Sequence, residues 1–160
     1  YSEVGKGTVF RLLLPVSSEV AVSRVENRVP VRGHGRLLLV DDEPGIRDSG
    51  RAILTQLGYE VLLAENGADG VDVYQKEHEK IDLVLLDLAM PVMDGQTCLK
   101  KMHEIDPSIP VIVCSGFARD DVLTELEPLG VEAFLIKPFR VVELSQAIAQ
   151  VLVANRPPDH

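Results

Sequence analysis

Five short and almost continuous apolar runs, separated by segments of helical character, constrain the fold of this chain most strongly. They lie at residues 37–40, 61–64, 81–86, 111–114 and 133–136. Strands of a parallel sheet have this composition because helices bury both of their faces. The alternation therefore predicts an α/β fold with a doubly wound, five-stranded parallel sheet.

Residues typical of helix ends stand between these runs. Pro44 suits the first turn of a helix, and Gly58 suits its C-terminal end. Asn66 and Asp94 are predicted to cap the N-termini of the next two helices. The last two helices are expected at about residues 120–127 and 141–153.

Polar side chains stand at the ends of four of the five runs. They are Asp41, Asp42, Asp87, Ser115 and Lys137. Because ligands of open parallel sheets bind at the carboxyl ends of the strands, all five are expected at one edge. Two unit charges about 4 Å apart repel by roughly 4 kcal/mol at an effective dielectric of about 20, so three carboxylates need a cation. An all-oxygen ligand set favours Mg²⁺ or Mn²⁺ over zinc.

The two remaining side chains suit a phosphoryl group. The Lys137 ammonium can pair with Asp87 when the site is empty and with a phosphoryl oxygen when it is occupied. The Ser115 hydroxyl can donate a hydrogen bond to a second phosphoryl oxygen. The sequence thus predicts a pocket that holds a divalent cation and handles a phosphoryl group.

These residues and their neighbours resemble the receiver domain of two-component response regulators. The matching motifs are Asp41-Asp42, Asp87 with Met90-Pro91-Val92-Met93-Asp94-Gly95, Ser115-Gly116 and Ile136-Lys137-Pro138-Phe139. The resemblance spans about residues 35–153 and implies the flavodoxin-like (βα)5 receiver fold. It also implies a cis peptide bond between Lys137 and Pro138, which proline makes chemically accessible.

The resemblance assigns Asp87 as the phosphoacceptor, which takes a phosphoryl group from a phosphohistidine with the help of Lys137 and Ser115. Asp42, Asp87 and the backbone carbonyl of Ala89 would bind Mg²⁺ directly. Asp41 would act through metal-bound water. The expected partner is a histidine kinase domain or a histidine phosphotransfer protein.

Two further pairs of residues receive roles in this interpretation. Ser115 and Phe134 would form the conformational switch, although ordinary core packing explains Phe134 equally well. Ala89 and Phe117 stand two residues after Asp87 and Ser115 and would flank the path of an attacking water. Neither side chain can hydrogen-bond that water, so slow self-dephosphorylation is predicted.

Two other function classes stay open. A Mg²⁺-dependent phosphohydrolase could use Asp87 as nucleophile, but such enzymes place a second aspartate where this chain has Ala89. A receiver-like binding module that is never phosphorylated is the other alternative. Dimerisation on phosphorylation is also left open.

The N-terminal region predicts a larger parent protein. Gly5-Lys6-Gly7-Thr8-Val9-Phe10, followed by Leu14-Pro15, resembles the end of a histidine-kinase ATP-binding domain. The expected organisation is a kinase remnant at 1–15, a linker at 16–35, the receiver at 36–153 and a tail at 154–160. The parent would be a hybrid sensor histidine kinase. This segment lacks the rest of the ATP site, so as a catalyst it would act only in its own phosphorylation and dephosphorylation.

Charge and hydropathy limit the remaining possibilities. The net charge is −9, and residues 1–36 carry six Lys/Arg against three Asp/Glu, so the acidic charge lies in the predicted receiver. This balance disfavours direct nucleic-acid binding. No apolar stretch reaches the length of a membrane span, and two cysteines without metal spacing favour a cytoplasmic location. A membrane anchor elsewhere in the parent kinase is compatible with this interpretation.

Overall fold

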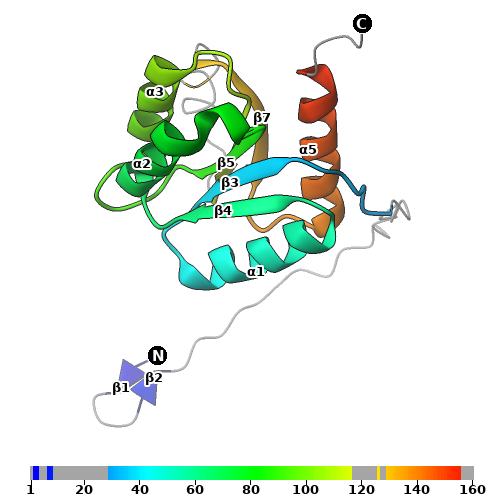
Figure 1. Ribbon diagram of the computed structural model, residues 1–160. Helices are drawn as coiled ribbons and strands as arrows, with labels where there is room; N and C mark the ends of the chain where they lie inside the picture. The colour runs from blue at the N-terminus through cyan, green and yellow to red at the C-terminus, as the bar shows by residue number, and fades with distance from the viewer. Residues whose placement is uncertain (1, 4–6, 9–28, 117–125, 127–128, 156–160) are drawn as a thin grey trace, which may run out of the picture.

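The structure is a computed structural model that describes residues 2–3, 7–8, 29–116, 126 and 129–155 (Figure 1). The strands of the main sheet are β3 (Arg36–Val40), β4 (Glu60–Ala64), β5 (Leu83–Asp87), β6 (Val111–Ser115) and β7 (Val131–Ile136). The helices are α1 (Pro44–Gln56), α2 (Gly67–Glu77), α3 (Gly95–Ile105) and α5 (Val141–Ala154), with a 3₁₀ turn η1 (His78–Lys80). Near the N-terminus, β1 (Ser2–Glu3) pairs antiparallel with β2 (Gly7–Thr8).

All five strands of the main sheet are parallel, in the order β4-β3-β5-β6-β7. The predicted doubly wound sheet is confirmed. The chain moves from β3 outward to β4 and then returns to the other side of β3 for β5, so the strand order reverses between β3 and β5. The carboxyl ends of these two neighbouring strands are where ligands bind in such sheets.

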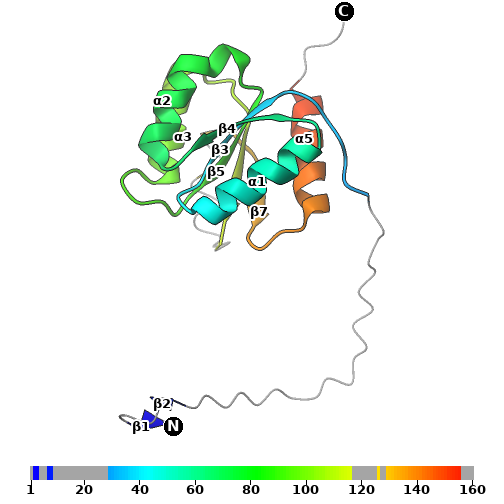
Figure 2. The same cartoon turned by 60° about the horizontal axis from the view of Figure 1, so that its bottom comes forward.

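Helices cover both faces of the sheet, with α1 and α5 on one side and α2 and α3 on the other (Figures 1 and 2). Successive strand residues alternate between the two layers. Leu38 and Val40 pack with Tyr74 and Met102 in the α2–α3 layer, whereas Leu37 and Leu39 pack with the α1–α5 layer. Burial on both faces explains why the strands are nearly continuous apolar runs.

The predicted helix caps are confirmed. The Asn66 side chain accepts a hydrogen bond from the Asp69 amide at 2.9 Å, and the Asp94 carboxylate accepts one from the Thr97 amide at 2.7 Å. The expected fourth helix lies outside the described residues, except for residue 126, which is helical. Within the described part of the chain, no helix is long and apolar enough to cross a membrane.

The third strand differs from the prediction, which began it at Ile81. It begins at Leu83, because the Ile81 amide bonds to the His78 carbonyl and closes the 3₁₀ turn. The Asp82 amide bonds to the Arg36 carbonyl, and the Asp82 carboxylate accepts from the Arg36 amide at 2.7 Å. These contacts join the chain to the start of β3 before regular pairing begins.

Candidate functional site

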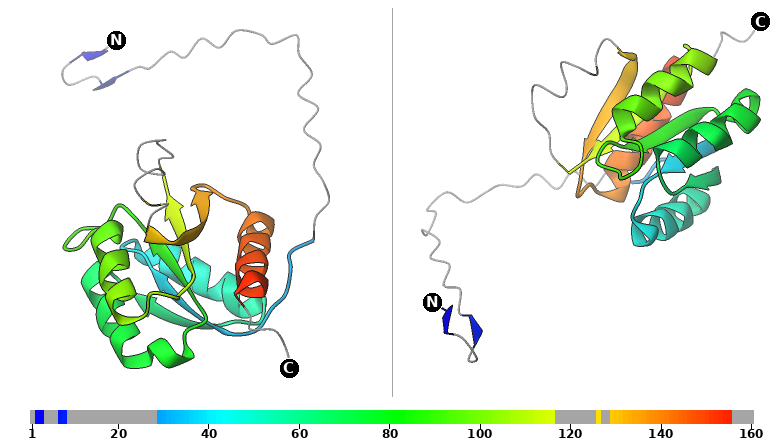
Figure 3. Two further views of the ribbon diagram at one scale, coloured as in Figure 1. Left: turned by 90° about the horizontal axis from the view of Figure 1, so that it is seen from above. Right: turned by 90° about the vertical axis from the view of Figure 1, so that its left-hand side faces the viewer.

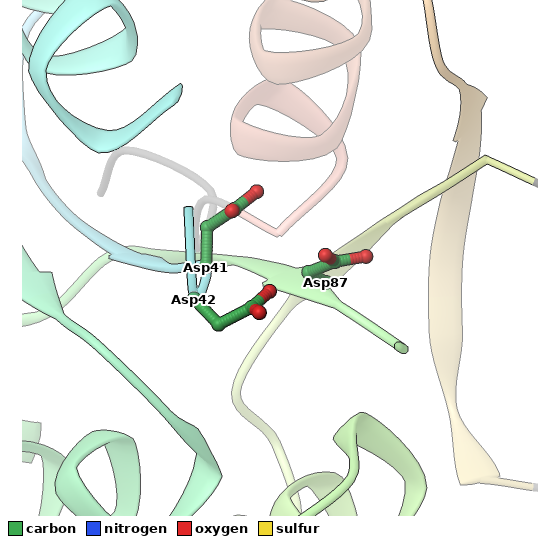
Figure 4. A group of neighbouring side chains, drawn as sticks. All are labelled: Asp41, Asp42 and Asp87. Atoms are coloured by element: carbon green, nitrogen blue, oxygen red, sulfur yellow. The ribbon is translucent and has the colours of Figure 1, made fainter. Parts of the chain in front are cut away.

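Three carboxylates meet at the edge where the strand order reverses. Asp41 and Asp42 directly follow β3, and Asp87 is the last residue of β5 (Figure 4). The register pairs Val40 with Leu86, so Asp41 and Asp87 occupy corresponding positions on neighbouring strands. One oxygen from each carboxylate lies within 4.8 Å of the other two. These hard oxygen donors fit a small divalent cation such as Mg²⁺.

Lys137, which directly follows β7, reaches across the sheet edge to two of these carboxylates. Its Nζ lies 2.6 Å from Asp41 Oδ2 and 3.1 Å from Asp87 Oδ2. Burial alone would lower the pKa of Lys137, but the hydrogen bonds and negative charges of both aspartates outweigh this effect and raise it. The expected pairing with Asp87 is present, and the shorter contact with Asp41 was not predicted.

Backbone contacts hold Lys137 and Asp41 in place. The Lys137 amide donates to the Ser115 carbonyl at 2.8 Å, and the Lys137–Pro138 peptide bond is cis, as the resemblance implied. The Glu43 amide donates to Asp41 Oδ1 at 3.0 Å. The Arg47 guanidinium donates to the Asp41 carbonyl at 2.7 Å. Sequence reasoning missed Arg47, although an arginine one turn into the helix after an acidic pair was an available signal.

The loop after Asp87 is tightly packed against its own strand. A Cβ at Gly95 would lie 2.3 Å from the Asp87 carbonyl oxygen, so only glycine permits this approach without a shift. The Met93 amide donates to the Pro91 carbonyl at 2.8 Å, and Val92 between them has a φ of 71°. Left-handed backbone is unfavourable for a β-branched residue. Ala89 is exposed in the same loop.

Two of the three remaining residues with predicted switch or dephosphorylation roles, Ser115 and Phe134, lie within the described part of the chain. Ser115 ends β6 and is half-buried, at the same sheet edge as Asp87. Phe134 is half-buried in β7 and packs against the α2–α3 layer. Phe117 lies outside the described residues. Cys114, beside Ser115, is buried, and this burial raises the pKa of its thiol to about 12, so it is protonated at neutral pH.

Residues 37–149 match the response regulator receiver domain family. Over 118 residues the chain is 39% identical to the chemotaxis protein CheY of Bacillus subtilis, covering 73% of this chain and 97% of that protein. It is 34% identical over 161 residues to the sensor kinase CckA of Brucella abortus, covering 94% of this chain but only 17% of the kinase.

A solved structure gives the same result. The CheX–CheY–BeF3–Mg complex of Borrelia burgdorferi contains a chain that is 30% identical, with a TM-score of 0.71. That match covers 73% of this chain and 88% of the other. Sequence, strand order and solved structure agree over the same region. The chain therefore belongs to the response regulator receiver domain family.

Proposed function

We propose that this receiver domain takes a phosphoryl group from a phosphohistidine onto Asp87. The observation that carries the proposal is the position of the Lys137 ammonium between Asp41 and Asp87 within a group of three carboxylates. Such a cation can leave one carboxylate and pair with an incoming phosphoryl oxygen. One ammonium balances a single unit of negative charge, so a purely structural ion pair would leave two of the three carboxylate charges uncompensated.

In the proposed reaction, a carboxylate oxygen of Asp87 attacks the phosphorus atom. A P–O bond forms as the P–N bond of phosphohistidine breaks, and the imidazole nitrogen keeps the electron pair. Lys137 pairs with one phosphoryl oxygen, and the Ser115 hydroxyl donates to another. The hydrogen bonds from Glu43 and Arg47 hold Asp41 in place during the transfer.

Receiver domains bind Mg²⁺ at an acidic pocket, and the three aspartates supply such a pocket here. The proposed direct ligands are Asp42, Asp87 and the Ala89 carbonyl, with Asp41 acting through water. When bound, the ion would supply positive charge that offsets the carboxylates and the incoming phosphoryl group. Mn²⁺ offers the same coordination chemistry.

Transfer would change the shape of the domain through Ser115 and Phe134. Moving the hydroxyl toward the phosphoryl group makes room for the aromatic ring to rotate inward. Phe134 is half-buried on β7, so such a rotation would alter the exposed surface of that edge strand. A partner protein could bind one form of this surface more tightly than the other. Dimerisation on phosphorylation is left open.

Receiver domains interact with histidine kinases or phosphotransfer proteins, and the donor proposed here is one of these. The match to the sensor kinase CckA supports a hybrid kinase as parent because it covers 94% of this chain. The parent's kinase activity, the kinase remnant at 1–15 and the cytoplasmic location are part of the proposal. Direct binding to nucleic acid or to a membrane is not expected of this segment.

The test is intact-mass spectrometry after incubation with Mg²⁺ and acetyl phosphate, with Asp87→Asn as the control. The expected result is a gain of about 80 Da, the mass of one phosphoryl group, in the unsubstituted chain (called the parent chain below) and not in Asp87→Asn. An adduct on Asp87→Asn would show that another residue is phosphorylated. No adduct on the parent chain, with Mg²⁺ binding confirmed separately, would contradict phosphorylation by a small donor and favour the binding-module alternative.

A further inference from the structure

Residues 29–35, which we call the strap, lie on the α1–α5 face of the domain before the chain enters β3. The Val31 amide donates to Ser145 Oγ in α5 at 3.0 Å. The Gly33 amide donates to the Leu57 carbonyl, at the C-terminal end of α1, at 3.0 Å. Figures 2 and 3 show this segment, drawn in blue, passing beside α5. The strap is thus attached to both helices of one layer.

The strap is closely packed against the body of the domain around Gly33. A Cβ at Gly33 would lie 2.0 Å from the hydroxyl oxygen of Tyr59, whose side chain is buried. A Cβ at Gly58 would lie 2.4 Å from the Gly33 carbonyl oxygen. Two glycines therefore allow the strap to approach the body at a distance that other residues would prevent. Gly58 also has a φ of 106°, which favours glycine with or without the strap. A segment resting loosely on the surface, however, would not need the glycine at position 33.

Ser145 gives a second, independent reason to regard the strap as part of the domain. The buried polar and charged side chains among the described residues are Asp41, Asp87 and Ser145, and the first two belong to the acidic site. The Ser145 hydroxyl donates to the Val142 carbonyl at 2.9 Å and accepts from the Val31 amide. Alanine would suit the helix better than serine. The contact with the strap explains a buried hydroxyl at this position.

We propose that the strap is an integral part of the receiver, clasped by Ser145, and that it occupies this part of the α1–α5 face. Val29 and Pro30 line a hollow of about 270 Å³ with Ile53, Leu57 and Val141. The chain therefore joins the body beside Val141, at the start of α5, instead of at β3. A protein that binds over this part of the face has to contact the strap or displace it.

The test measures hydrogen exchange of the Gly33 amide by NMR in the chain of 160 residues. Ser145→Ala removes the acceptor of the clasp, and Val31→Pro removes its donor. Each substitution should speed exchange of the Gly33 amide by about fivefold or more, because opening of the strap exposes it. The double variant should be no faster than the faster single variant, because both changes break the same bond.

Ser49→Ala is the matched control. The exposed Ser49 hydroxyl donates to the Gly45 and Ile46 carbonyls of its own helix, so its loss breaks neither bond of the strap and the Gly33 amide should exchange as in the unsubstituted chain. The Leu38 amide in the interior strand β3 should exchange equally slowly in all variants, which separates strap opening from global unfolding. Unchanged Gly33 exchange in both single variants, or additive effects in the double variant, would overturn the proposal.

The proposal for the strap is independent of the proposed phosphorylation of Asp87. Acetyl phosphate is a small donor that need not touch residues 29–35, so all strap variants should form the Asp87 adduct at the parent rate within about twofold. Failure of every variant, and of the parent chain, to form the adduct would count against the proposed function only. If only the Ser145→Ala and Val31→Pro variants failed to form the adduct, this would contradict the proposal that Ser145 and Val31 act only in holding the strap.

Discussion

Replacing Lys137 with methionine removes an ammonium that lies 2.6 Å from Asp41 and 3.1 Å from Asp87 and keeps an unbranched apolar side chain. Removing one partner of a buried ion pair costs about 3–5 kcal/mol, because the other charge stays buried without compensation. The Lys137 side chain is 18% exposed, so solvent screening reduces this cost. We expect the free energy of unfolding to fall by about 2–3 kcal/mol without Mg²⁺. For a domain of this size, Tm should fall by roughly 6–15 °C.

Saturating Mg²⁺ should reduce this difference by more than half, because the bound ion supplies the positive charge that the variant lacks. The assay is urea denaturation at pH 7 with and without Mg²⁺, and Lys137→Arg is the control that keeps the charge. Equal stability of Lys137→Met and the parent chain without Mg²⁺ would refute the argument. A difference that Mg²⁺ leaves unchanged would refute the link between the lysine and the cation site.

The raised pKa of Lys137 also determines how the stability difference between the unsubstituted chain and Lys137→Met depends on pH. The pKa of Lys137 is raised in the folded state, so its contribution to stability is fully present below its unfolded pKa of about 10.4. This contribution is lost as pH rises through the higher folded pKa. The gap between the parent chain and Lys137→Met should therefore stay constant from about pH 7 to about pH 9. A gap that narrows within this range would contradict the raised pKa.

Three further substitutions test the loop, the helix contact and the lifetime of the phosphoryl group. Val92→Gly should raise the free energy of unfolding by about 0.5–1 kcal/mol in urea denaturation, because Val92 has a φ of 71° and is 87% exposed, so little packing is lost; a decrease would contradict this. Arg47→Met should lower it by about 1 kcal/mol through loss of the bond to the Asp41 carbonyl, and no change would show that water replaces the guanidinium. Ala89→Asn should shorten the lifetime of the Asp87 adduct by roughly fivefold in timed mass spectra, since an amide can orient water; an equal lifetime would remove Ala89 from that role.

Local signals in the sequence were sufficient for the elements of this domain. The apolar runs located all five strands because burial on both faces demands such composition. Asn66 and Asp94 located two helix starts because each cap bond joins residues three positions apart. Ile81 was assigned to a strand wrongly, since its apolar character serves the core equally well after a 3₁₀ turn.

The acidic site was predictable for a similar reason. Parallel strands deliver their carboxyl ends to one edge, so polar residues that end apolar runs must gather there. The motifs around Asp87 and Lys137 then carried the resemblance to receiver domains. The choice of partners within the site was not predictable in the same way. Lys137 contacts Asp41 as well as Asp87, and Arg47, whose position after the acidic pair was a signal, bonds to the Asp41 backbone carbonyl and not to a carboxylate.

Only the tertiary structure decided the contacts between distant parts of the chain. Lys137 and Asp41 are 96 positions apart, and Val31 and Ser145 are 114 apart. Residues 29–35 show no period and contain proline and glycine, so the sequence indicated a linker. Their attachment depends on a serine in the last helix and on the space beside Tyr59. The sequence by itself determined which segments form strands and helices and which edge holds the acidic residues, because burial and capping act over a few residues. Packing between remote segments selected the partners of those residues.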